Sequence, residues 1–268
     1  MKKFKKILSA VTIAVAALGL AACSSSSSSN SSSYKSELLT KNTLTIGLEG
    51  TYSPYSYRKN GKLTGFEVDL GKAVAKEMGL KAKFVPTKWD SLIAGLGSEK
   101  FDVVLNNITQ TPERKKSYNF STPYIYSRYI LVTKKGSNLK TLKALKGKKM
   151  AEGTGTNNAV LVKKYGATVV PSGEFATSVS LVRQGRVAGT VNAAEAWYAY
   201  AKENNTKGLQ VTELSSQVKP VKVSGLFNKK DKKLLARFNK ALKKVRKNGT
   251  LKKLSVKYFG GDITEDAN

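Results

Sequence analysis

The stretch LNNITQTPERKKSYNFSTPY, at Leu105–Tyr124, places the end of a strand directly before the start of a helix. The short apolar run at Phe101–Leu105 is typical of a buried strand. Thr111–Glu113, Thr-Pro-Glu, is a helix-start signal, and Arg114 follows in the first turn. A guanidinium and free backbone N–H groups at a helix start suit a small carboxylate. The alternative here is a plain strand–loop–helix connection with a surface arginine.

Apolar strand-like runs alternate with amphipathic helical stretches along most of the chain. This alternation predicts an α/β fold rich in parallel strands with right-handed crossovers. Ligands of such open sheets bind beyond the carboxyl ends of the strands. Polar residues that follow predicted strands are therefore site candidates: Glu49, Asn106, Asn107 and Asn192.

The segment ITQTPERKKSYNFSTPY resembles the T-x-E-R-x-x-x-x-x-F-S-x-P-Y block of the amino-acid-binding proteins that serve ABC importers, solute-binding protein family 3. The similarity covers roughly residues 42 to 261 and continues in order through GTYSPYSY, GFEVDL, Trp89–Leu96, LKGKKMAEGTGT, QGRVAG and NGTLKKLSVKYFG. Within the family, EGTYSPYSY and the paired asparagines are most similar to the cystine-binding branch.

The resemblance implies the periplasmic-binding-protein type II fold. In that fold two lobes, each a mostly parallel sheet flanked by helices, are joined by two crossover strands with a ligand cleft between them. Residues 42–127 and 221–268 would form lobe 1, and residues 128–220 lobe 2. It also implies a binding protein, not an enzyme, that closes on a polar amino acid, L-cystine in particular, and delivers it to a membrane permease.

The resemblance further implies a set of ligand-binding residues. Arg114 would hold the ligand carboxylate, and free N–H groups of Gly155 and Thr156 would meet it from lobe 2. Tyr52 and Trp89 would enclose the apolar part, although burial of Trp89 in the lobe core is an equal alternative. The full expected set is Glu49, Tyr52, Trp89, Asn106, Asn107, Thr109, Arg114, Gly155, Thr156, Asn157 and Asn192.

One position departs from the family pattern. Relatives that bind free α-amino acids commonly have an aspartate one position after Asn192, where it pairs with the ligand ammonium, and this chain has Ala193. An ammonium buried without an anionic partner is costly. Glu49 or Glu195 is expected to supply the anion, or else the ligand has no free α-amino group.

Two absences narrow the chemistry. The 268 residues include no histidine and a single cysteine, Cys23. Histidine metal ligands, His-activated nucleophiles, disulfides and thiol catalysis are therefore excluded. We expect no metal and no cofactor, and an enzyme on this fold is the least favoured hypothesis.

The N-terminal segment has the pattern of a lipoprotein signal. Met1–Ala22 has four lysines and an apolar run of 14 residues, Ile7–Leu20, too short for a stable transmembrane helix. Leu20–Cys23, LAAC, resembles a bacterial lipobox, which implies lipid on Cys23 and anchoring at the outer face of the cell membrane. The alternative is an ordinary signal peptide. The serine-rich segment within residues 23–41 is expected to be a flexible tether, with folding from near Asn42.

The chain is strongly basic, with 47 Lys and Arg against 18 Asp and Glu, a net charge of +29. Loss of the signal segment removes four lysines and no acid, leaving +25. Such a field attracts polyanions. An alternative function is therefore adhesion to anionic envelope or matrix polymers, whereas nucleic acid is a less favoured partner for an exported chain.

Overall fold

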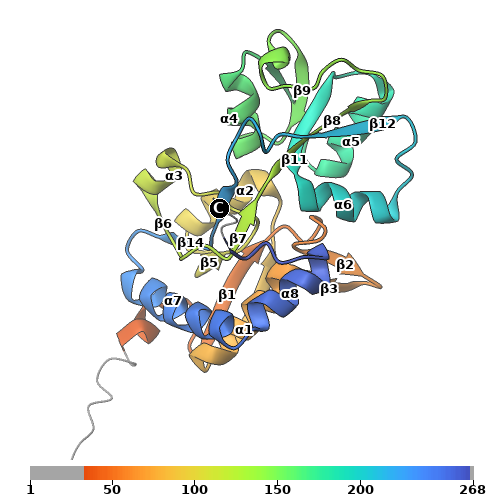
Figure 1. Ribbon diagram of the computed structural model, residues 1–268. Helices are drawn as coiled ribbons and strands as arrows, with labels where there is room; N and C mark the ends of the chain where they lie inside the picture. Colours follow the sequence, from red (N-terminus) through yellow and green to blue (C-terminus); the bar gives the residue numbers. More distant parts are fainter. Residues whose placement is uncertain (1–32, 266–268) are drawn as a thin grey trace, which may run out of the picture.

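The computed structural model describes residues 33–265, which form two lobes stacked along one axis (Figure 1). Cys23, the signal segment and most of the serine-rich tether lie outside the described residues. Among residues 33–265, no helix combines the length and apolarity needed to cross a membrane.

Lobe 1 is built on a five-stranded sheet in the order β4-β1-β5-β14-β6. Strand β1 has the sequence TLTIGL, and all but its first residue are buried. It runs parallel to β4 and β5, whereas β14 is antiparallel to β5 and β6, so the sheet is mixed. The strands are β1 Thr43–Leu48, β4 Lys81–Pro86, β5 Val103–Val104, β6 Tyr118–Phe120 and β14 Leu226–Asn228.

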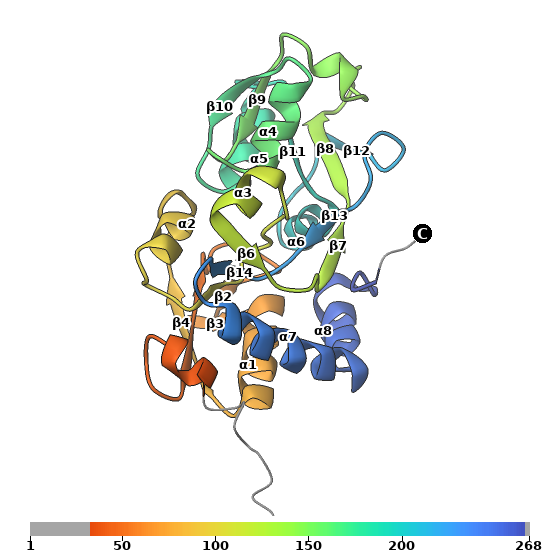
Figure 2. The same ribbon diagram turned by 90° about the vertical axis from the view of Figure 1, so that its left-hand side faces the viewer.

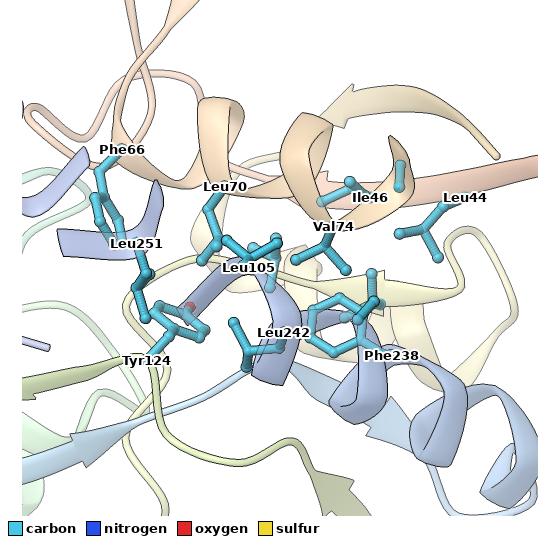
Figure 3. Packing of buried hydrophobic residues seen from close by; sticks show 14 of the residues in the cluster. Leu44, Ile46, Phe66, Leu70, Val74, Leu105, Tyr124, Phe238, Leu242 and Leu251 are labelled. Carbon is cyan, nitrogen blue, oxygen red and sulfur yellow. The ribbon is translucent and has the colours of Figure 1, made fainter. Parts of the chain in front are cut away.

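Helices cover both faces of this sheet. On one face Leu70 and Val74 of α1 pack against Phe238 and Leu242 of α7 in one continuous core (Figure 3). On the other face α2 packs over β5 and β14. The helical elements are η1 Ser33–Glu37, α1 Phe66–Met78, α2 Trp89–Gly97, α3 Pro112–Ser117, α7 Lys232–Lys247 and α8 Thr250–Phe259, and β2 Tyr57–Lys59 pairs with β3 Lys62–Thr64 as a hairpin.

Lobe 2 repeats the plan with the sheet order β10-β9-β11-β8-β12. Strand β9 is parallel to β10 and β11, whereas β8 is antiparallel to β11 and β12. The elements are β8 Tyr129–Lys134, η2 Lys143–Leu145, β9 Lys149–Glu152, α4 Asn157–Lys164, β10 Thr168–Pro171, α5 Phe175–Gln184, β11 Gly189–Ala193, α6 Ala194–Glu203 and β12 Leu209–Glu213. The two-lobed α/β fold expected from the sequence is confirmed.

Two antiparallel strands connect the lobes. Strand β7 (Ile125–Ser127) leaves lobe 1 and β13 (Val221–Val223) returns to it, paired with Ser127 opposite Val221. Figure 2 shows this ribbon between the lobes. A narrow two-stranded connection lets two rigid bodies rotate relative to one another, which is the geometry of a hinge.

The structure differs from the sequence-based prediction at two places. Ordered chain begins before Asn42, because Tyr34 is buried and its hydroxyl donates to the Met78 carbonyl at 3.0 Å. The Asp102 carboxylate also accepts the backbone N–H of Leu39 at 2.8 Å. Helix α6 was not predicted, because it follows β11 without a break and its N-cap, Ala193, is not a capping residue.

Candidate functional site

A cavity lies between the lobes at the ends of strands from both sheets. It holds about 820 Å³ of space outside the protein atoms, part of it open to solvent, and a position between two lobes is typical of small-molecule sites. Ten of the eleven predicted binding residues line it: Glu49, Tyr52, Trp89, Asn106, Asn107, Thr109, Arg114, Thr156, Asn157 and Asn192. The exception is Gly155.

Arg114 is held in the cavity wall by the local sequence. The hydroxyl of Thr111 accepts the N–H of Arg114 at 3.2 Å and so caps α3. The guanidinium donates to the carbonyl oxygens of Thr109 at 3.0 Å and Gly155 at 3.3 Å, and it lies 5.6 Å from the ring centre of Trp89. Burial lowers the pKa of Arg114. Within residues 33–265 it forms no ion pair, so its charge faces the cavity without an anion.

Glu49 and Asn106 form a reciprocal pair at neighbouring strand ends. The Asn106 amide donates to Glu49 Oε2 at 2.6 Å, and its Oδ1 accepts the Glu49 N–H at 2.8 Å. Burial is the main cause that raises the pKa of Glu49 to about 7. The carboxyl group can therefore exist in both protonation states near neutral pH, and a cation beside it would favour the charged one.

Asn107 has a left-handed backbone conformation, with φ of 50°, and its backbone is hydrogen-bonded to a buried residue of α1. Its N–H donates at 2.7 Å to Glu67, whose same oxygen accepts the Tyr124 hydroxyl. Burial raises the pKa of Glu67 to about 7. The side-chain oxygen of Asn107 is buried without a hydrogen-bond partner, which leaves an acceptor beside the cavity for a ligand N–H group.

Tyr52 and Trp89 reach across the cleft. The Tyr52 hydroxyl donates to Asn192 Oδ1 at 2.7 Å, and the Trp89 indole N–H donates to the Thr154 carbonyl at 2.7 Å. Both bonds join lobe 1 to lobe 2. The two aromatic residues thus contact the opposite lobe as well as lining the cavity.

The loop before α4 is arranged differently from the expectation. The Thr156 side chain caps α4 by accepting the Ala159 N–H at 3.0 Å, and its backbone N–H is used in a turn to Gly153 at 3.2 Å. Gly155 has φ of 69° and presents its carbonyl to Arg114. The expected pair of free N–H groups is therefore not formed here, because the turn consumes one and Gly155 lies off the cavity wall. Asn157 donates to the Tyr129 hydroxyl.

The position after Asn192 offers no charge. Ala193 is buried, and Asn192 Oδ1 also accepts the Ala193 N–H at 2.8 Å. Glu195 does not line the cavity: its carboxyl is buried near Ser127 and Tyr55, and burial raises its pKa. The alternative in which Glu195 reaches back to a ligand is not supported by this arrangement.

Several cavity residues were missed from the sequence, including Tyr129, Glu152, Ser172, Glu174, Phe175 and Ser178. The rule that found Glu49, a polar residue after a strand, would also have found Glu152 at the end of β9. Glu174 precedes α5 in a strand-to-helix loop. Tyr129 and Ser178 lie inside elements and carry no such signal. In the described part of the chain, no three His, Cys, Asp or Glu side chains are placed to hold a metal ion.

Comparison with known proteins adds family evidence. Residues 44–261 match the bacterial extracellular solute-binding proteins, family 3. A probable amino-acid ABC transporter-binding protein of Haemophilus influenzae is 39% identical, over 83% of this chain and 87% of the relative. The L-cystine-binding protein TcyA of Bacillus subtilis is 36% identical, over 97% of this chain and 100% of the relative.

Solved structures agree with the fold. An ancestral arginine-binding protein bound to arginine superposes with a TM-score of 0.76 at 36% identity, covering 82% of this chain and 99% of that one. The L-cystine solute receptor of Neisseria gonorrhoeae, in the unliganded open conformation, superposes with a TM-score of 0.58 at 37% identity, covering 83% and 94%.

Proposed function

The chain belongs to the bacterial extracellular solute-binding proteins of family 3, and from this premise we propose that it captures L-cystine between its lobes for a membrane permease. The family is non-catalytic and extracellular or periplasmic. The chain is thus a solute-binding protein of an amino-acid ABC transporter, as the sequence predicted at that level.

The unpaired positive charge of Arg114 carries the proposal. A half-buried guanidinium that forms no ion pair within residues 33–265 is unfavourable unless a ligand supplies a carboxylate. Thr109 and Gly155 hold its orientation through their carbonyls. A planar fork fixed in this way suits bidentate bonding to an α-carboxylate.

The choice of L-cystine rests on similarity and on the polar cavity wall. Two of the similar proteins are described as cystine-binding, TcyA and the gonococcal receptor. The side chains of Glu49, Asn106 and Asn107 offer a carboxylate and amides at the end of the cleft in lobe 1. Because an arginine-binding protein has nearly the same sequence identity, 36% against 37%, and superposes with the higher TM-score, 0.76 against 0.58, L-arginine is the main competing ligand.

The proposed mechanism is closure of the lobes about β7 and β13. Hydrogen bonds of Tyr52 and Trp89 already join the lobes here. This chain is 37% identical to the open gonococcal receptor and 36% identical to the arginine-bound protein, but the TM-score with the open receptor is lower, 0.58 against 0.76. A different angle between the two lobes would produce such a difference. A ligand that contacts both lobes favours the closed form, which a permease would recognise.

Tryptophan fluorescence offers a direct test, because Trp89 lies in the cavity wall. We expect the emission of the chain from Ser24 onward to change saturably with L-cystine. The Trp89→Phe variant should lose that change, and Trp197→Phe should keep it, since Trp197 packs inside lobe 2. A saturable response to L-arginine but not to L-cystine would contradict the cystine assignment.

We also propose that Cys23 anchors the protein through lipid, on the basis of the LAAC motif. The mass of the protein from a bacterial membrane fraction should exceed that of the chain from Cys23 by the mass of the acyl groups. The Cys23→Ser variant should instead be released to the medium. An unmodified Cys23 in the mature protein would reject the anchor.

Polyanion binding is a second candidate property, favoured by a basic surface over α7 and α8. This surface consists of exposed lysines: Lys232, Lys233, Lys240, Lys243, Lys244, Lys247, Lys252, Lys253 and Lys257. Retention on a polyanionic resin should fall steeply with salt. Replacing Lys240, Lys243 and Lys247 by glutamine should reduce retention and leave amino-acid affinity unchanged.

A further inference from the structure

Two carboxylates from different lobes line the same cavity. Glu49 follows β1 in lobe 1, and Glu174 precedes α5 in lobe 2. Within residues 33–265 neither takes part in an ion pair. The cavity's remaining acidic residue, Glu152, is buried and accepts the Val191 N–H at 2.7 Å, and burial raises its pKa well above the ordinary value. Glu152 is therefore held by the backbone of its own lobe, and Glu174 is the exposed carboxyl side chain of the lobe 2 wall.

The side chain of Glu174 makes no hydrogen bond or ion pair within residues 33–265. It stands at the N-cap of α5, but its side chain makes no cap hydrogen bond, and only its backbone carbonyl accepts Ser178 N–H, at 3.1 Å. The carboxylate is exposed and free to turn into the cavity. An N-cap glutamate that does not cap is available to a ligand.

Glu174 of lobe 2 acts on Glu49 of lobe 1 across the cavity that both line. After burial, Glu174 is the first charged group among the causes that raise the pKa of Glu49, and Asp90 at the start of α2 adds to it. Asn106 acts in the opposite sense through its hydrogen bond. Closing the empty cleft thus brings like charges together, and a cation between them would relieve this repulsion.

We propose that Glu49 and Glu174 form a second subsite, completed only when the lobes close, that takes a cationic group of the ligand distant from the carboxylate on Arg114. The proposal rests on the proposed amino-acid-binding function and names its substrate class, amino acids with two cationic groups. L-cystine belongs to this class because it has two α-ammonium groups joined through a disulfide. Because one carboxylate comes from each lobe, such a ligand also stabilises closure.

The test compares two ligands that differ by one amino group. These are L-cystine and the mixed disulfide of L-cysteine with 3-mercaptopropionate, titrated calorimetrically into the chain from Ser24 onward, which contains every described element. A hydrogen-bonded charge pair in a closed site predicts about tenfold tighter binding of L-cystine by the unmodified protein. Glu174→Gln should remove most of this preference and leave affinity for the mixed disulfide within about twofold.

Glu203→Gln is the matched control, because Glu203 is an exposed glutamate of lobe 2 on α6 that does not line the cavity. It should change neither affinity. The melting temperatures of the empty variants should equal that of the parent, since neither side chain makes a hydrogen bond within the described part. Equal weakening of both ligands by Glu174→Gln, or no effect on either, would overturn the subsite.

Titrations with L-lysine, L-arginine and L-glutamine distinguish a failure of the proposed subsite from a failure of the cystine assignment. If the protein ignores L-cystine but binds L-lysine or L-arginine, and Glu174→Gln weakens that binding, the subsite stands and the cystine assignment fails. If it binds L-glutamine and none of the dicationic ligands, amino-acid binding stands and the subsite is overturned.

Discussion

The two lobes share a sheet plan but contribute different chemistry to the cleft. Lobe 1 places charged and aromatic side chains there, Arg114, Glu49 and Trp89 among them. Lobe 2 contributes backbone carbonyls, hydroxyls and amides, two aromatic side chains, Tyr129 and Phe175, and Glu174 as its exposed carboxylate. Lobe 1 has the largest buried cluster of the described residues and a second one beneath α2, whereas the core of lobe 2 is divided into smaller clusters.

This difference assigns a different step to each lobe. The charged and aromatic side chains that the core of lobe 1 holds in place suit the first capture of a ligand, since their geometry does not depend on closure of the lobes. Groups that lobe 2 offers become useful only when the hinge brings them near. In this account lobe 1 sets the affinity of capture, and lobe 2 adds selectivity and converts binding into a shape change.

Removal of the Arg114 guanidinium of lobe 1 should have the largest effect on ligand affinity. Arg114→Ala should weaken L-cystine binding by about 100-fold or more, because a ligand carboxylate would remain buried without its partner. Isothermal titration measures this loss. Arg58→Ala, an exposed arginine of the same lobe whose guanidinium bonds the Gly61 carbonyl, should leave affinity unchanged. Unchanged affinity in Arg114→Ala would remove lobe 1 from its capturing role.

The pH dependence of binding should come from lobe 1. An ammonium binds the ionised form of Glu49, whose pKa of about 7 lies above the usual glutamate range because of burial. Affinity should therefore rise with pH through about 7 and level off above it, by about tenfold between pH 6 and pH 8. Titrations across this range should be flat in Glu49→Gln.

Glu67 is the control for that prediction, since burial raises its pKa to about 7 as well. It supports Asn107 from within the lobe and does not line the cavity. Glu67→Gln keeps an acceptor oxygen, so the rise of affinity with pH should persist. An affinity that does not change with pH in Glu67→Gln would mean that Glu67, and not Glu49, causes the pH dependence of binding.

The contact between lobes through Trp89 should have a smaller effect. Trp89→Phe keeps an aromatic ring beside Arg114 and removes the N–H that bonds Thr154. One net hydrogen bond corresponds to about 1 kcal/mol, so affinity should fall by about fivefold, mostly through faster dissociation. Surface plasmon resonance with the immobilised protein separates the two rates, since this variant is expected to lack the tryptophan emission change. An equal loss in the association rate would place Trp89 in capture rather than closure.

The smallest effect is expected from the Tyr52 hydroxyl. Tyr52→Phe removes its bond to Asn192, and affinity should fall by about threefold, since Asn192 keeps the Ala193 N–H as a partner. Tyr198→Phe is the matched control, because that exposed hydroxyl of lobe 2 bonds Glu213 away from the cleft. A loss as large as that of Arg114→Ala would mean that Tyr52 contacts the ligand directly.

The sequence was most informative where local signals and function coincide. Thr111 and the proline after it predicted the start of α3, and the structure confirms the cap that fixes Arg114. Glu49 and Asn106 were found because they follow strands, and their reciprocal hydrogen bonds account for that position.

What the sequence could not provide depends on tertiary closure. Glu174 acts on Glu49 only when two lobes distant in sequence meet. Gly155 was expected to offer an N–H group, yet its positive φ turns the carbonyl toward Arg114. Helix α6 begins without a capping residue, so no local pattern indicated it.

A thermal-shift measurement with the chain from Ser24 onward tests the central claim most directly, using L-cystine, L-arginine, L-glutamine and N-acetyl-L-glutamine. Ligand at about 100 times its dissociation constant stabilises the folded state by about 2.7 kcal/mol, which corresponds to about 5–10 °C for a protein of this size. The account predicts this rise with L-cystine and none with the N-acetylated compound. No rise with any amino acid would contradict it.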